Sequence, residues 1–267
     1  MLYISMIVFS AIVPPSPLLI PVIGKDHTQQ LTATLKAYAE LQEHLIASRP
    51  DVIVVITTQT AVEYERFEIN QSPTLVGTLS EFGDLDFSLE RTGALGFCHH
   101  WKEQLEHSVD VHLCTFNELP YDATVPLFLL TNSLASVPIA VTSSSRASWG
   151  EHFRFGKESQ HIFLTRKERI AVIVSGTLSP RLSPDSPAGF SLAGKSYDSM
   201  LIKHFRKWDT EAIRAMDPQL VEEAGAPAHQ GILLMIGMLN GIGIASDILC
   251  YESPFGIGYM TAEFKIL

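Results

Sequence analysis

Residues 3–13 read YISMIVFSAIV and residues 52–57 read VIVVIT. Both stretches are almost continuously apolar and rich in β-branched residues, which is typical of strands covered on both faces. Between them, apolar side chains recur at helical spacing, at Leu31, Leu35, Tyr38, Leu41 and Leu45. We expect this helix to start at a cap on Asp26 or Thr28 and to end at Ser48. The strand–helix–strand order predicts a parallel sheet with covering helices.

The rest of the chain continues the same alternation. We expect strands at residues 67–79, 109–114, 138–142, 169–175, 245–251 and 258–266, and helices at residues 95–107, 126–134, 149–166, 197–216 and 230–239. No repeat, low-complexity tract or long linker interrupts them. The predicted fold is therefore α/β, with a central mixed, largely parallel sheet covered by helices in a single domain over residues 1–267.

Composition excludes several classes of function. The 267 residues are 46% apolar and 18% charged, with a formal net charge of −10. An acidic chain without a basic stripe is a poor partner for nucleic acid or an anionic membrane. The cysteines Cys98, Cys114 and Cys250 are too few and too far apart for a disulfide scaffold or a thiolate zinc site.

The first 24 residues are apolar enough to raise the question of a signal peptide or a membrane helix. No Lys or Arg precedes Lys25, so the basic region of a signal peptide is missing. Prolines at positions 14, 15, 17 and 21 interrupt the stretch too often for a membrane helix. We expect a cytoplasmic protein with no membrane association.

Five short stretches contain prolines, glycines or small polar residues between apolar residues. They are residues 13–21 (VPPSPLLIP), 56–59 (ITTQ), 120–127 (PYDATVPL), 175–182 (SGTLSPRL) and 223–226 (EAGA). Their order and spacing resemble the class III extradiol ring-cleavage dioxygenases, the LigB-like superfamily, and in particular its Memo-like branch. There the same stretches read roughly VPHPPLLIP, ISPH, DHGTLVPL, SGDLSHRL and EAGE. The resemblance spans residues 9 to 241 and implies the dioxygenase-like fold.

The resemblance also implies where chemistry would reside. Family members hold Fe(II) by two His and one Glu, at positions that Pro15, Gln59 and Ala226 occupy here. The family's proton-transferring histidines fall on Tyr121 and Pro180. Proline and alanine side chains offer no donor atom, Gln59 offers only a neutral carbonyl, and a phenol with a pKa of about 10 is a poor base. We therefore expect a degenerate member with no catalytic residue, no metal and no cofactor.

Two functions remain open for such a protein. The emptied pocket, if it persists, would be neutral and hydrogen-bonding, suited to a small uncharged aromatic or amide ligand. Its expected residues are Pro15, Gln59, Tyr121, Thr177, Ser179, Pro180 and Ala226. Alternatively, the chain is a non-catalytic scaffold that pairs with itself or with a homologous active subunit.

A third interpretation keeps the chain an enzyme, either a ring-cleavage dioxygenase or another metal-dependent oxidoreductase with relocated ligands. Glu223 and His229 flank the altered position 226. His99, Glu103 and His107 recur every four residues on one face of a predicted helix, a spacing able to hold zinc or copper.

Overall fold

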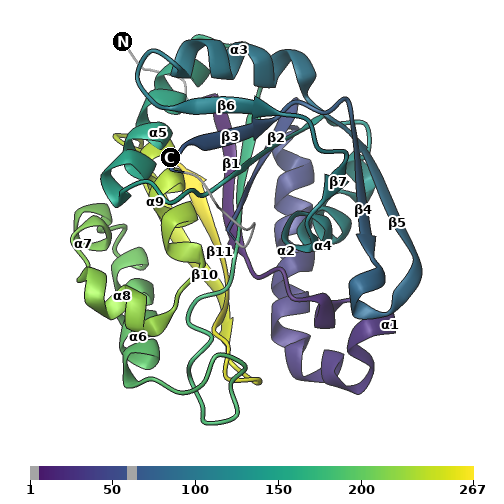
Figure 1. Cartoon of the computed structure of the whole chain (residues 1–267), viewed down its shortest axis with the longest axis vertical. Helices are drawn as coiled ribbons and strands as arrows, with labels where there is room; N and C mark the ends of the chain where they lie inside the picture. The colour runs from purple at the N-terminus through teal and green to yellow at the C-terminus, as the bar shows by residue number, and fades with distance from the viewer. Residues whose placement is uncertain (1–5, 59–64) are drawn as a thin grey trace.

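The centre of the computed structural model, which describes residues 6–58 and 65–267, is a group of parallel strands (Figure 1). They are β1 (Ile7–Val13), β9 (Ile170–Ser175), β2 (Val52–Thr57) and β8 (Ile139–Ser143), side by side in that order. Nearly every residue of these strands is buried, as their continuous apolar sequences require.

Strands of mixed direction extend this centre on both sides. β11 (Tyr259–Ile266) pairs antiparallel with β1, and β10 (Ile244–Glu252) forms the edge beyond it. On the other side, β3 (Phe67–Asn70) pairs antiparallel with β8 and parallel with β6 (Val111–Cys114). The predicted mixed, largely parallel sheet in one α/β domain is therefore confirmed.

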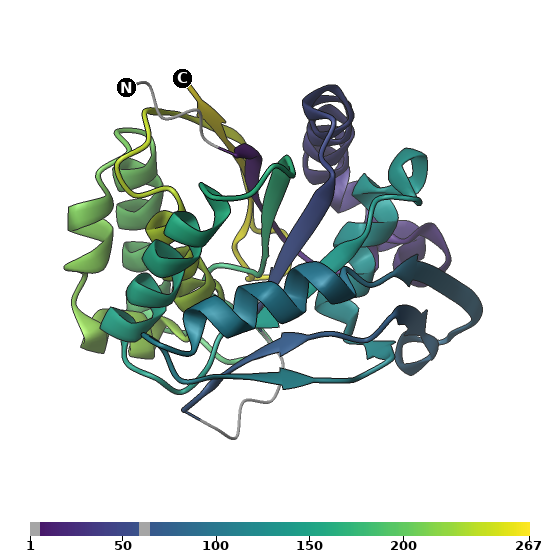
Figure 2. The ribbon, with the colours of Figure 1, turned by 90° about the horizontal axis from the view of Figure 1, so that it is seen from above.

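Helices cover both faces of the sheet, as Figures 1 and 2 show from two directions. One face carries α2 (Thr32–Ser48) and α4 (Tyr121–Leu130), and α1 (Pro21–Gly24) lies beside them. The other face carries the remaining helices of the described chain: α3 (Leu95–Leu105), α5 (Trp149–Phe163), α6 (Leu192–Phe205), α7 (Thr210–Arg214), α8 (Pro218–Ala224) and α9 (Ala228–Met238). The predicted buried helix at residues 230–239 corresponds to α9, whose side chains are nearly all buried.

Several predicted boundaries are wrong for local reasons. The expected helix starting at Asp26 or Thr28 begins at Thr32, after a 3₁₀ segment over Lys25–Leu31, and the Thr28 hydroxyl donates to the Leu18 carbonyl rather than capping it. The expected strand at 67–79 is two strands, because Ser72 and Pro73 interrupt it. The second one, β4 (Thr74–Leu79), belongs to a small separate sheet with β5 (Asp84–Thr92) and β7 (Glu118–Leu119).

Helix α4 begins at Tyr121, five residues before the predicted start, and carries Pro126 in its interior. Proline has no backbone N–H to bond to the carbonyl four residues earlier, which here belongs to Asp122. The Ser175 hydroxyl, at the end of β9, donates to that same carbonyl. A side chain of the central sheet thus replaces the helical hydrogen bond that Pro126 cannot make.

Helices α5 and α9 cross in backbone contact. A Cβ atom added to Gly156 would lie 2.0 Å from the Leu234 carbonyl oxygen, and one added to Gly237 would lie 2.3 Å from the Phe153 carbonyl oxygen. Two glycines at the crossing therefore let the helices approach more closely than any side chain allows. Among residues 6–58 and 65–267, none of the helices combines the length and the hydropathy that a membrane span requires.

Candidate ligand-binding site

The carboxyl ends of β1, β9 and β2 meet at one edge of the sheet. Val13 is paired with Ser175, and Ser175 with Thr57, so the chain segments that follow these residues start side by side. The Gly176 N–H donates to the Val13 carbonyl at 3.0 Å, and the Thr58 hydroxyl donates to the Ser175 carbonyl at 2.8 Å. In parallel α/β sheets this edge is where ligand sites are built.

Asp122 connects α4 to this edge. Its side chain is buried, and its Oδ2 accepts a hydrogen bond from the Thr58 backbone N–H at 3.1 Å. Together with the bond from Ser175 to its carbonyl, this contact fixes the first turn of α4 against the ends of β2 and β9. The neighbouring Tyr121 is thereby held at the same edge.

The loop after β9 is tied to α6, α8 and α9. The Ala228 N–H donates to the Thr177 carbonyl at 3.2 Å, and the Ser179 hydroxyl donates to the Ala224 carbonyl at 2.7 Å. A Cβ on Gly176 would lie 2.5 Å from the Thr58 hydroxyl oxygen, so this position requires glycine. The small and polar residues of the SGTLS stretch, residues 175–179, therefore hold the loop after β9 in place.

Asp198, on α6, anchors the same loop. Its Oδ1 accepts from the Ser179 N–H at 2.9 Å, and its Oδ2 accepts from the Tyr251 hydroxyl at 2.6 Å. Burial raises the pKa of this carboxyl to about 6, although both hydrogen bonds act in the opposite direction.

A cavity of about 650 Å³, here called the proline pocket, opens at this edge. Four of the predicted site residues line it: Pro15, Tyr121, Thr177 and Pro180. The other lining residues are Ser16, Pro17, Leu18, Ile23, Phe82, Pro227, Ile257 and Tyr259. The walls are thus formed by proline rings, aliphatic side chains and aromatic rings, with a few hydroxyl groups between them.

The phenols of the proline pocket are uncharged. Burial raises the pKa of Tyr121 to about 12, and the negative charges of Asp122 and Glu81 act in the same direction. Burial also raises the pKa of Tyr259. The Phe82 ring packs edge-on against Tyr121, with the ring centroids 5.1 Å apart. Tyr121 is therefore a fixed, neutral hydrogen-bonding group rather than a base.

A second cavity of about 420 Å³ lies on the other side of Pro227, a residue that lines both cavities. We call it the histidine pocket because the buried His229 lines it together with Ala226, Thr58 and Trp149. Pro218, Val221, Glu222, Gly225 and Gln230 complete its lining. Trp149 was missed in the sequence, because only the crossing of α5 over α9 brings it next to His229, with ring centroids 4.4 Å apart.

The remaining predicted site residues lie elsewhere. Ser179 is fully buried and does not line either pocket, since its hydroxyl is engaged with the backbone of α8. Gln59 lies outside the described residues, directly after Thr58.

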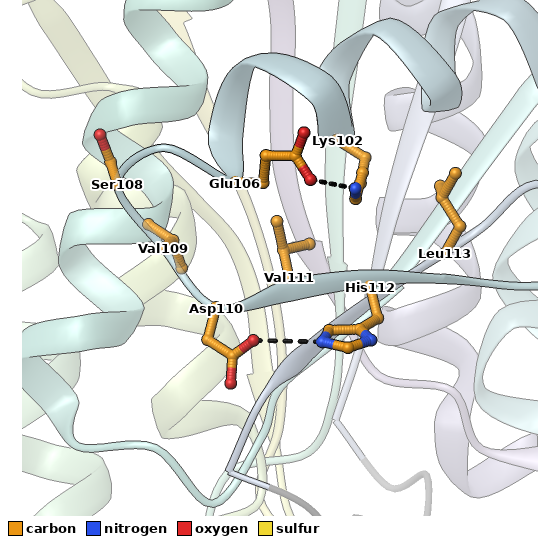
Figure 3. A pocket seen from close by; sticks show the side chains of 8 residues that line it. All are labelled: Lys102, Glu106, Ser108, Val109, Asp110, Val111, His112 and Leu113. Atoms are coloured by element: carbon orange, nitrogen blue, oxygen red, sulfur yellow. Dashed lines mark hydrogen bonds and ion pairs between the residues drawn. The ribbon is translucent and has the colours of Figure 1, made fainter.

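The sets considered as relocated metal ligands do not assemble. Glu223 is exposed, and its carboxylate accepts from the Gln219 amide rather than facing the buried His229. His99 and Glu103 form an exposed pair at 3.5 Å. Further along α3, Lys102 is paired with Glu106 in a pocket beside β6, and Asp110 is paired with His112 at 3.3 Å (Figure 3). Across residues 6–58 and 65–267, no three His, Cys, Asp or Glu side chains are grouped to hold a metal ion.

Fold and site together describe an α/β protein with paired pockets at the carboxyl edge of its parallel strands. Residues 11–262 match the sequence profile of the family described as the catalytic LigB subunit of aromatic ring-opening dioxygenase. The chain belongs to this family.

Two individual proteins are similar to this chain. The chain is 22% identical to Protein CA_C1420 of Clostridium acetobutylicum over 259 residues, which are 93% of this chain and 55% of that protein. It therefore spans about half the length of this curated relative. The crystal structure of the uncharacterized protein JW3007 from Escherichia coli K12 superposes with a TM-score of 0.68 at 13% identity, covering 96% of this chain and 99% of that one. That likeness shows the fold.

The iron of the ring-opening dioxygenases does not fit the residues described at this edge. An Fe(II) site open to substrate and dioxygen needs imidazole and carboxylate ligands. The proline pocket has neither group in its lining, and the histidine pocket has one imidazole and one carboxylate, without a third ligand among the described residues.

Proposed function

We propose that this protein is a degenerate, non-catalytic member of the LigB family that binds a small uncharged aromatic molecule in the proline pocket. The observation that carries the proposal is the lining itself. A cavity of about 650 Å³ lies where three of the five stretches meet, those at residues 13–21, 120–127 and 175–182, and it presents Pro15, Pro180 and the neutral Tyr121.

The chemistry of this lining favours one class of ligand. Proline rings and aliphatic side chains bury an apolar ring, and a few fixed polar groups orient it, as in most small-molecule sites. Tyr121 offers a hydroxyl that donates to a carbonyl oxygen or accepts from an N–H. Among the described residues, no Lys, Arg, Asp or Glu lines the pocket, so an ionic ligand would lose its hydration without gaining a partner. A neutral aromatic amide satisfies all of these conditions.

Binding of benzamide tests the proposal. We expect benzamide to raise the unfolding temperature, and Tyr121→Phe to weaken its binding roughly fivefold, the effect of one neutral hydrogen bond. Thr165→Val is the control, because it also removes one hydroxyl, and Thr165 is an exposed residue outside the lining of both pockets. Binding that is absent, or that does not respond to Tyr121→Phe, contradicts the proposal.

The non-catalytic part needs a separate test. Purified protein is analysed for Fe, Zn, Cu and Mn, and is assayed for catechol ring cleavage after addition of Fe(II). We expect less than stoichiometric metal and no cleavage. Stoichiometric metal that is lost on substitution of Glu223 or His229 would establish the alternative, a metal-dependent oxidoreductase with relocated ligands.

A further inference from the structure

His229 is a buried imidazole with one unused nitrogen. The side chain is 1% exposed, and its Nδ1 lies 3.1 Å from the Tyr197 hydroxyl. Its Nε2 has no hydrogen-bond partner among the described residues. Buried polar atoms are nearly always paired, so an orphan of this kind needs an explanation.

Counting hydrogen bonds assigns the proton on this ring. Tyr197 is fully buried, and its hydroxyl makes no other hydrogen bond within the described chain. Burial raises the pKa of Tyr197 and lowers that of His229 to about 4, so both groups are neutral at pH 7. If Tyr197 donates to Nδ1, only the Nε2–H is left without a partner. If instead Nδ1–H donates to Tyr197, both the phenol proton and the Nε2 lone pair are left without partners. The first tautomer is favoured, and it leaves a donor at Nε2.

The surroundings of this donor are those of a binding site. His229 lines the histidine pocket, whose size of about 420 Å³ suits a one-ring or two-ring molecule. The Trp149 indole, which is half-buried, packs against the imidazole with ring centroids 4.4 Å apart. Within residues 6–58 and 65–267, no Lys or Arg lines this pocket, whereas Glu222 does, so an anionic acceptor is disfavoured.

We propose that the histidine pocket is a second ligand site, in which His229 Nε2–H donates to the carbonyl oxygen of an uncharged aromatic ketone or amide. Nε2 is covered in the structure, and the half-buried Trp149 ring packs against the imidazole. Entry of the carbonyl therefore requires a neighbouring side chain to move, and Trp149 offers a flat face for the ligand ring. This site is separate from the proline pocket, with Pro227 between them.

Acetophenone and ethylbenzene are matched probes, because they differ chiefly in the carbonyl oxygen. We expect long-range ¹H–¹⁵N spectra of the free protein to show His229 protonated at Nε2. Acetophenone should shift that nitrogen, and ethylbenzene should not. A His229 protonated at Nδ1, or an Nε2 signal that neither probe moves because a buried water already satisfies it, overturns the proposal.

Variants measure the contribution of the donor. We expect His229→Phe to weaken acetophenone binding about tenfold relative to ethylbenzene, since the ring remains and the N–H is lost. Tyr197→Phe keeps the imidazole but removes the hydroxyl that fixes its tautomer, so it should lower the Nε2-protonated fraction even if His229→Phe fails to fold. Tyr121→Phe reports on the proline pocket and should leave acetophenone binding at His229 unchanged. An equal loss for both probes in His229→Phe contradicts the assigned role.

Discussion

Replacing Gly156 with alanine should separate α5 from α9. The new Cβ would lie 2.0 Å from the Leu234 carbonyl oxygen and 2.8 Å from the Met238 nitrogen, both backbone atoms that cannot rotate away. An ordinary contact begins near 3.4 Å, so the helices must shift by about 1.4 Å at the crossing. The result is strain in a fully buried layer rather than a local adjustment of one side chain.

The magnitude follows from two opposing effects. Alanine favours a helix over glycine by about 1 kcal/mol. Overpacking of a buried layer costs about 1–3 kcal/mol, and more where backbone meets backbone. At the upper end of this cost, we expect a net loss of roughly 2 kcal/mol in the free energy of unfolding, or a fall of about 4–8 °C in Tm for a chain of this size.

Urea unfolding followed by far-UV circular dichroism measures this change. Gly96→Ala is the matched control, because Gly96 is also a helical glycine but a Cβ there meets nothing within 4 Å. The control should gain about 0.5–1 kcal/mol. If Gly156→Ala is as stable as the control, the backbones of α5 and α9 are not in contact at Gly156, and the prediction is wrong. Because α5 carries Trp149 and α9 carries His229, the variant should also change the Trp149 fluorescence.

Two further predictions concern the loop after β9. The pKa of Asp198 in the folded protein, about 6, exceeds its unfolded value of 3.8, so its stabilising contribution is complete below about pH 4 and is lost as the pH rises through 6. Between pH 4.5 and 7.5 this loss amounts to about 2 kcal/mol in the free energy of unfolding. Urea denaturation of the wild type and of Asp198→Asn at both pH values measures it. A difference in unfolding free energy between the two proteins that does not change with pH would refute the prediction. Gly176→Ala places a Cβ 2.5 Å from the Thr58 hydroxyl oxygen and 2.9 Å from the Ala228 Cβ. We therefore expect the free energy of unfolding in urea to fall by about 2 kcal/mol. Unchanged stability would show that the residues around Gly176 can move to make room.

The sequence predicted the central sheet well because its signals are local. Residues 52–57 are apolar at every position, and the structure places β2 at the same bounds. Boundaries failed where tertiary contacts override local preference. A helix was predicted from residue 126, but α4 begins at Tyr121 and carries Pro126 in its interior. It tolerates this proline because the Ser175 hydroxyl bonds to the carbonyl that proline leaves without its helical donor.

The candidate site was predicted in part. Pro15, Tyr121, Thr177 and Pro180 were expected to face one cavity, and they line the proline pocket. Ser179 was expected there as well, but its hydroxyl bonds to the Ala224 carbonyl instead. From the sequence alone, a serine whose hydroxyl faces a ligand cannot be distinguished from one whose hydroxyl joins two segments of the chain.

By itself, the sequence determined the parallel α/β order and, through five short motifs, the family. These follow from hydrophobic periodicity and from short motifs, which depend on neighbouring residues in the chain. The division of the edge into two pockets was decided by the tertiary structure alone. Trp149 and His229 are 80 positions apart, and they meet because glycines at the crossing of α5 and α9 bring the two backbones into contact. Such a contact depends on three-dimensional distance, for which a single sequence carries no local signal.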